Sequence, residues 1–176
     1  MWRRLLALAC GLICFAVAPA LAQDTALWRT VGQWQIRIDA SPGYGCFLVA
    51  NYARTVLRIG IDQQNDKSYV MVGNEAWRSL QVGNQYDLAL GFDDSARPWL
   101  WRGSAIARRI GNGDMVFLHL SFDRALLVEM GRRNLMTIYY QGAVVTSLRL
   151  LGTNAAVQEM LNCQRAADTV RKEDRP

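Results

Sequence analysis

The sequence predicts a mainly β domain, either an antiparallel sandwich or a partly open barrel. Short segments in which apolar and polar residues alternate recur along most of the chain, and turn residues separate them. Only two segments, near 123–131 and near 153–165, space their apolar residues as helices do, and both lie late in the chain. Residues 23–165 therefore read as a single β-rich domain with two short helices.

Residues 1–22 have the order of a cleavable signal peptide. Two arginines form a basic start, an apolar run follows over 5–17, and an A-x-A site of small residues ends at Ala22. A transmembrane anchor needs about 20 apolar residues, so the shorter run favours cleavage between Ala22 and Gln23. We therefore predict a periplasmic or secreted protein that keeps no transmembrane anchor.

Removal of this leader changes what the charge implies. The formal charge of the whole chain is +5, and it falls to +3 without Arg3 and Arg4. A weakly basic, exported chain with no recognisable nucleic-acid module argues against a nucleic-acid partner. Anionic partners, if any, would be components of the cell envelope.

The cysteines predict one crosslink. Cys10 and Cys14 leave with the leader, so only Cys46 and Cys163 remain. A cysteine pair in an exported chain is typical of a disulfide. A Cys46–Cys163 bridge would close a loop of about 120 residues and tie an early strand to the last helix.

The strands follow one another from residue 28 onward. Within residues 28–38, Trp34, Ile36 and Ile38 fall on one face and polar residues on the other, so we predict one half-buried strand there. Further strands are expected over six segments separated by turn residues: 46–51, 55–61, 68–73, 86–92, 99–106 and 115–122.

The pattern changes after residue 122. Asp123 can cap a short helix over 124–131. Residues 134–140 and 144–151 are expected to form a hairpin, and the last helix to run from Asn154 to about Arg165. Residues 166–176 are charged and lack apolar spacing, so we expect a disordered tail.

No catalytic or metal-binding grouping stands out, and we predict no cofactor. The lone His119 lies among apolar strand residues, which favours a packed or rim side chain, and a single histidine excludes a multi-histidine zinc site. Asp93 and Asp94 are neighbours in a turn. Glycoside hydrolysis needs two carboxyl groups about 5–10 Å apart, so a hydrolase using acids near Asp93 is kept as an alternative.

The aromatic residues give the best candidate for a binding surface. Trp99 and Trp101 share a strand face, and Arg97 and Arg102 flank them. Aromatic side chains usually pack cores, but an exposed tryptophan pair between cations could stack on sugar rings, seat a peptide or rest on lipid headgroups. We therefore predict Arg97, Trp99, Trp101 and Arg102 as a candidate surface for an envelope protein or an anionic envelope component.

Two stretches carry a resemblance to known families. One is W-R-S-L-x-x-G-x-x-Y-x-L-x-L-x-F-D over 77–93, and the other is L-x-G-x-x-A-A over 150–156, in a segment ending at Cys163. Together they resemble uncharacterised small exported proteins of alphaproteobacteria, and the second is also similar to the invasion-associated locus B family of periplasmic proteins. The resemblance implies an exported β-rich protein and assigns no site residue.

The leading hypothesis is a non-enzymatic, exported binding or envelope-associated module. Its motivation is the leader, the aromatic and arginine residues, and the lack of a catalytic grouping. A small hydrophobic-ligand carrier with a barrel cavity is the second hypothesis, because a closed barrel can hold a ligand.

Overall fold

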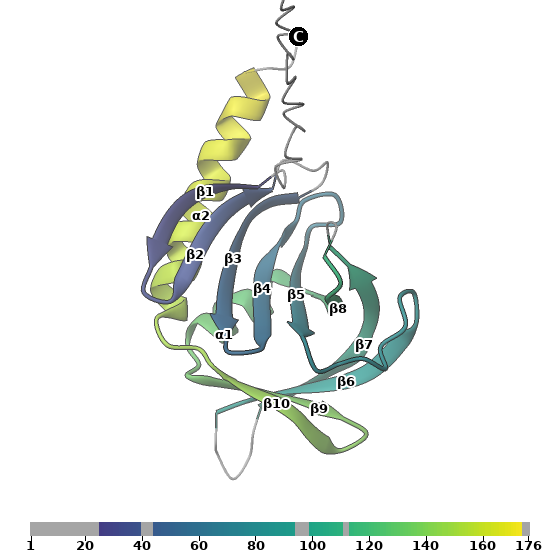
Figure 1. Ribbon diagram of the computed structural model, residues 1–176. Helices are drawn as coiled ribbons and strands as arrows, with labels where there is room; N and C mark the ends of the chain where they lie inside the picture. Colours follow the sequence, from purple (N-terminus) through teal and green to yellow (C-terminus); the bar gives the residue numbers. More distant parts are fainter. Residues whose placement is uncertain (1–24, 40–43, 94–98, 111–112, 174–176) are drawn as a thin grey trace, which may run out of the picture.

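The protein is mainly β, as predicted, with one sheet that does not close on itself (Figure 1). The computed structural model describes residues 25–39, 44–93, 99–110 and 113–173. Within them, ten antiparallel strands lie in the order β1-β2-β3-β4-β5-β8-β7-β6-β9-β10. Two helices complete this part of the chain, and the fold is a partly open barrel.

The elements follow the chain in a simple order. The first five strands are β1 (Thr25–Val31), β2 (Trp34–Asp39), β3 (Tyr44–Tyr52), β4 (Thr55–Asp62) and β5 (Lys67–Asn74). The other strands are β6 (Gln85–Phe92), β7 (Trp99–Arg109), β8 (Val116–Phe122), β9 (Leu135–Tyr140) and β10 (Ala143–Arg149). The helices are α1 (Arg124–Gly131) and α2 (Thr153–Glu173).

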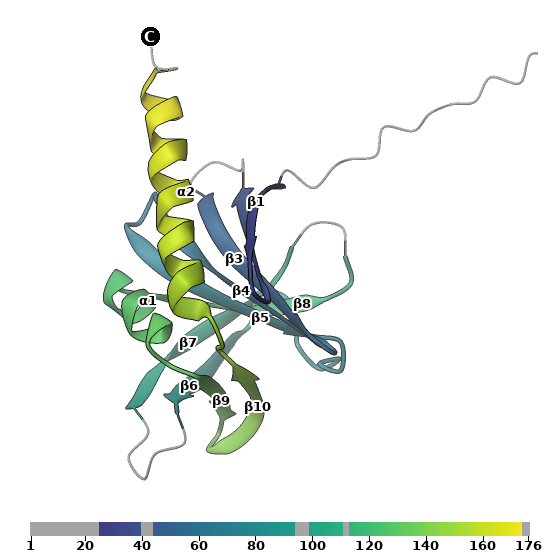
Figure 2. The ribbon, with the colours of Figure 1, turned by 90° about the vertical axis from the view of Figure 1, so that its left-hand side faces the viewer.

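The two helices lie on the inner side of the curved sheet. Helix α2 packs against β2, β3 and α1, and in Figure 2 it runs along the first strands and projects past them. The N-terminal strands also bond to the segment that leads into α2. The Trp34 indole N–H donates to the Leu151 carbonyl at 3.1 Å, and the Tyr52 hydroxyl donates to the Arg149 carbonyl at 2.5 Å. The start of the sheet is thereby tied to the end of β10.

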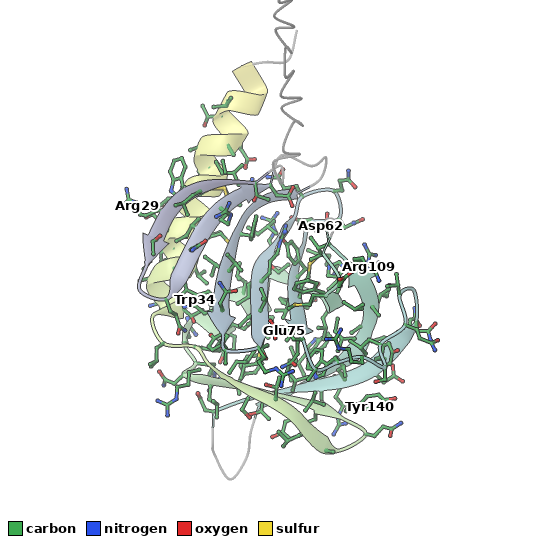
Figure 3. The ribbon with its side chains drawn as sticks, in the orientation of Figure 1. Arg29, Trp34, Asp62, Glu75, Arg109 and Tyr140 are labelled. Atoms are coloured by element: carbon green, nitrogen blue, oxygen red, sulfur yellow. A yellow bond between two sulfur atoms is a disulfide. The ribbon has the colours of Figure 1, made fainter. Side chains whose placement is uncertain are left out.

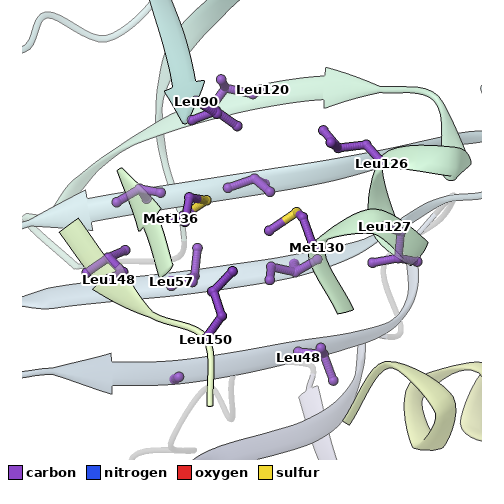
Figure 4. Close-up of a cluster of buried hydrophobic side chains, with 14 of the residues drawn as sticks. Leu48, Leu57, Leu90, Leu120, Leu126, Leu127, Met130, Met136, Leu148 and Leu150 are labelled. Carbon is purple, nitrogen blue, oxygen red and sulfur yellow. The ribbon is translucent and has the colours of Figure 1, made fainter. Parts of the chain in front are cut away.

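One hydrophobic core fills the space between the sheet and the helices. Buried strand residues such as Leu48, Leu57 and Leu90 gather with Met130 of α1 in this core (Figure 4). Met160 of α2 is also buried in it. Alternation explains which residues face inward, because every second side chain of a strand points to the same face. A ligand-carrying barrel would need part of this interior to be open, and these side chains occupy it.

The expectation of one strand over 28–38 is wrong. Two strands, β1 and β2, form a hairpin that turns at Gly32 and Gln33. Gly32 has φ +57°, a left-handed conformation that glycine adopts without the steric cost of a side chain. The alternation of Trp34 and Ile36 survives in β2, where both side chains are fully buried.

The last helix is longer than predicted. It continues past Arg165 to Glu173, so the expected disordered tail is wrong for residues 166–173, while 174–176 lie outside the described residues. Hydrogen bonds to Asp168 explain part of the extension. Its carboxylate accepts from Gln164 at 2.9 Å and from Gln63, in the β4–β5 turn, at 2.8 Å.

The predicted disulfide is confirmed. Cys46 of β3 and Cys163 of α2 are bonded, with 6.0 Å between their Cα atoms. Both residues are fully buried. Gln164 supports the junction, because its side-chain carbonyl accepts a hydrogen bond from the Cys46 backbone N–H at 2.9 Å. The bridge therefore anchors the last helix to the middle of the first half of the sheet.

Asp123 takes the N-cap position of α1 without capping it by a side-chain hydrogen bond. Its carboxylate instead contacts Lys67 of β5. The predicted bounds of the helix, 124–131, are confirmed. Among the described residues, neither helix has both the length and the apolar character that a bilayer-crossing segment needs.

Candidate functional site

The predicted tryptophan–arginine stretch does not form one surface in the described structure. Trp101 pairs across the sheet with the buried Leu90 and points to the core side, where its ring lies 6.0 Å from that of Phe122. Arg102, the next residue of β7, is exposed and points to the opposite face. Trp99 begins β7 but its side chain is not described, and Arg97 lies outside the described residues.

A hollow of about 450 Å³ adjoins Trp101, between β8 and α1. The two carboxylates on its wall are already engaged in ion pairs. Asp123 contacts Lys67, and Glu129 contacts Arg133. The hollow is therefore lined by aromatic rings and by carboxylates whose charges are already paired, and among the described residues it offers no unpaired charge to a ligand.

A larger groove lies over β6, β7 and β9. We call it the tyrosine groove; it has a volume of about 870 Å³. Figure 3 labels Tyr140 at its β9–β10 end. The groove is lined by Gln85, Tyr86, Asp87, Leu88, Ala89, Arg102, Gly103, Ser104, Tyr139, Tyr140, Gln141 and Gly142.

The strand register explains the shape of the tyrosine groove. Ala89 of β6 pairs with Arg102 of β7 on one side and with Tyr139 of β9 on the other. Paired residues lie on the same face of a sheet, and this face is opposite to the one on which Leu88 is buried. A small residue between two large ones leaves a hollow, and two strand spacings separate its walls by about 10 Å. Asp87 and Ser104 pair in the neighbouring row.

Most polar side chains of the tyrosine groove are free to bind something else. Within the part of the chain that the structure describes, Asp87, Arg102, Ser104 and Tyr139 form no side-chain hydrogen bond or ion pair. Arg102, Asp87 and Ser104 are exposed, and Tyr139 is half-buried. Their backbones are held in paired strands, so the side chains project from a rigid base.

The other two lining tyrosines, Tyr86 and Tyr140, lie at the end of the groove on the face of the sheet that also carries Leu88, because Tyr140 pairs with Leu88 and Tyr86 is two residues before it. The rings of Tyr86 and Tyr140 meet edge to face, with centroids 6.1 Å apart. The Tyr86 hydroxyl accepts a hydrogen bond from the Gln81 backbone N–H at 3.1 Å. The Gln141 side-chain amide donates to the Tyr140 hydroxyl at 3.3 Å. Sequence reasoning missed this site, because its residues come from three strands and no local pattern joins them.

A second buried cluster lies on the outer face of the sheet, away from the main core. Arg58 is at its centre and is only 7% exposed. Its guanidinium lies 3.7 Å from the centroid of the Phe47 ring, bonds to Asp39 at 2.6 Å and donates to the Tyr69 hydroxyl at 2.9 Å. The aromatic ring and the carboxylate offset part of the desolvation penalty of burying the Arg58 charge.

His119 borders this cluster and is packed, as the sequence suggests. It is 8% exposed, and its ring meets Tyr69 edge-on at 5.6 Å. The buried Nε2 atom has no hydrogen-bond partner among the described residues. Burial lowers the pKa of His119 to about 4, and the positive charge of Arg108 adds to this effect while Asp62 opposes it. The imidazole is therefore neutral at physiological pH.

The burial of His119 predicts a loss of stability in mild acid. The unfolded chain binds the proton near pH 6.5 and the folded chain only near pH 4, so stability falls as the pH drops through this window. The shift corresponds to about 3 kcal/mol at most. Urea unfolding at several pH values should show a shallower fall for His119→Phe than for the wild type. Equal slopes in the two proteins would contradict the assignment.

Asp93 has a structural role in this fold. It adopts φ +59° at the end of β6. Its carboxylate accepts hydrogen bonds from the backbone N–H groups of Asn134 at 2.9 Å and Leu135 at 3.3 Å, and it pairs with Arg133 at 3.3 Å. The Asn134 hydrogen bond is the main cause that lowers the pKa of Asp93, and Arg133 contributes. The ionised Asp93 carboxylate therefore links the end of β6 to the start of β9. Asp94 lies outside the described residues.

Metal-ligand side chains do not gather in the described ranges. No three His, Cys, Asp or Glu residues there come close enough to hold an ion. Of the two hollows described above, the tyrosine groove has more unengaged polar groups around it.

Comparison with known proteins did not identify a relative of this chain. No family model matches the chain, and searches of curated proteins and solved structures found no match either. The resemblance to small exported alphaproteobacterial proteins stays a prediction.

Proposed function

We propose that the protein is an exported, non-enzymatic binding module of the bacterial envelope and that the tyrosine groove is its binding site. The leader pattern of residues 1–22 supports export. The buried Cys46–Cys163 bridge agrees with an oxidising compartment.

One observation carries the choice of site. Unengaged polar side chains, among them Tyr139, line a hollow of about 870 Å³ over strands that are hydrogen-bonded into the sheet. Tyrosine and arginine are enriched among the residues that dominate binding energy, because they offer large contact area together with hydrogen bonds. A rigid backbone beneath them lowers the entropy lost when a partner binds.

The other hypotheses find less support. A hydrophobic-ligand carrier would use the interior, which core side chains such as Leu57 and Met136 occupy. A hydrolase with acids near Asp93 would need a carboxyl group able to exchange a proton, whereas Asp93 holds β9 in place. Binding through side chains of the sheet face requires neither a cavity nor a proton transfer.

The proposal predicts that binding depends on two groove residues. The chain is produced with its leader, isolated after export and immobilised, and then exposed to cell-wall sacculi, outer-membrane vesicles and soluble periplasmic proteins. We expect at least one fraction to be retained, and Arg102→Ala/Tyr139→Ala to reduce retention at least about tenfold, as loss of central binding residues does.

Arg109→Ala is the matched control for this experiment. Arg109 is exposed on the same strand as Arg102 but does not line the groove, so its removal should leave retention unchanged. Thermal unfolding of each variant checks that the fold is intact. Retention that is insensitive to the groove variant, or no retention of any fraction, would overturn the proposal.

A further inference from the structure

We infer that the tyrosine groove takes a neutral oligosaccharide chain. This inference rests on the proposed function and names the chemical class of the ligand. The candidates it competes with are an anionic envelope component, an apolar molecule and an extended peptide.

The charge of the groove argues against an anionic ligand. Of its lining residues, only Arg102 and Asp87 are charged, and their charges cancel. They lie in adjacent rows of the sheet and form no ion pair with each other. A phosphate or sulfate group close to Arg102 would also lie near the Asp87 carboxylate, which would repel it. A neutral ligand with both donors and acceptors can satisfy both residues.

The side chains match the hydrogen-bonding habits of sugars. Each sugar hydroxyl both donates and accepts, and the groove offers a donor in Arg102, an acceptor in Asp87 and groups of both kinds in Ser104 and Gln85. The Tyr139 ring supplies apolar surface for the C–H face of a sugar ring. An apolar ligand would instead cover these polar groups without bonding them, and each buried group left without a partner weakens binding.

The strand order argues against an extended peptide. Peptides that bind sheets usually add a strand at a free edge, where main-chain groups are available. Residues 88–92 of β6 pair with both β7 and β9, so their main-chain groups are already engaged. The end strands of the sheet are β1 and β10, and irregular register near Trp28 and Val145 disturbs both of them. At the Ala89 row, where both sides of β6 are paired, recognition falls to side chains such as Arg102 and Tyr139.

The experiment is a carbohydrate array followed by titration. The intact, exported protein is applied to an array of neutral hexose and N-acetylhexosamine oligosaccharides together with sulfated and uronic-acid oligosaccharides. Bound neutral sugars are then titrated as free tetrasaccharides by calorimetry. We expect binding to neutral sugars, with affinity reduced at least about tenfold in Tyr139→Ala and within about threefold of wild type in Tyr139→Phe, which keeps the ring.

The outcomes separate this inference from the proposed function. Binding to acidic sugars alone, or to no sugar, overturns the inference, and the function still stands if Arg102→Ala/Tyr139→Ala abolishes retention of an envelope fraction. If the protein binds neutral sugars and Tyr139→Ala leaves that affinity unchanged, the groove is not the binding site. This result would overturn both the inference and the proposed function. An unchanged Arg109→Ala titration confirms that loss in the other variants is local.

Discussion

Replacing Cys46 and Cys163 with alanine is expected to lower the free energy of unfolding by about 2–5 kcal/mol. The bridge spans 117 residues of sequence, and a closed loop of that length removes much of the freedom of the unfolded chain. Domains of this size have about 5–15 kcal/mol of stability in total. The variant should therefore be close to its unfolding threshold at physiological temperature.

Urea unfolding with and without reductant measures this effect. Reductant should shift the wild-type midpoint to that of Cys46→Ala/Cys163→Ala and leave the variant unchanged. Both cysteines are fully buried, so alkylation of the native, unreduced protein should label neither. Equal stability of wild type and variant would show that the bridge does not constrain the unfolded chain.

Replacing Arg58 with methionine is expected to cost about 3–5 kcal/mol. Methionine keeps an apolar stem against Phe47 but removes the charge that faces Asp39. The Asp39 side chain is 10% exposed, and a carboxylate that loses its charged partner in such a place is strongly destabilising. The Tyr69 hydroxyl also loses the hydrogen bond donated by Arg58.

A surface pair provides the matched control for Arg58. Arg54 and Glu75 lie 3.7 Å apart, with side chains 65% and 57% exposed, so Arg54→Met should cost less than about 1 kcal/mol. Arg58→Met/Asp39→Asn should recover part of the loss, because the charge left without Arg58 is removed as well. Equal costs for Arg58→Met and Arg54→Met would contradict the role given to the buried cluster.

Several parts of the fold could be predicted because their causes are local. The alternation of Trp34 and Ile36 identified a strand with one buried face, and the apolar spacing after Asp123 identified α1. The turn at Gly32 was missed, because the apolar residues on either side continue the same alternation through it. Period-two patterns locate strands well but do not show where one strand turns back into the next.

The binding surface predicted from the tryptophans and arginines near residue 100 does not form one surface, because strand alternation separates its described residues. Trp101 and Arg102 are neighbours in one strand, so alternation by itself places their side chains on opposite faces. Arg102 remains part of a candidate site, but its companions are Asp87 and Tyr139 rather than the tryptophans. No sequence pattern indicates that β6 would pair with both β7 and β9.

The β-rich fold class, the pair of cysteines available for a bridge and a packed or rim position for His119 can all be inferred from the amino-acid sequence. These properties follow from residue counts and from patterns within a few residues. The extension of α2 to Glu173, the buried Arg58–Asp39 pair and the tyrosine groove become visible only in the folded chain. Each of these depends on contacts between residues far apart in the chain, and strand order and register bring those residues together.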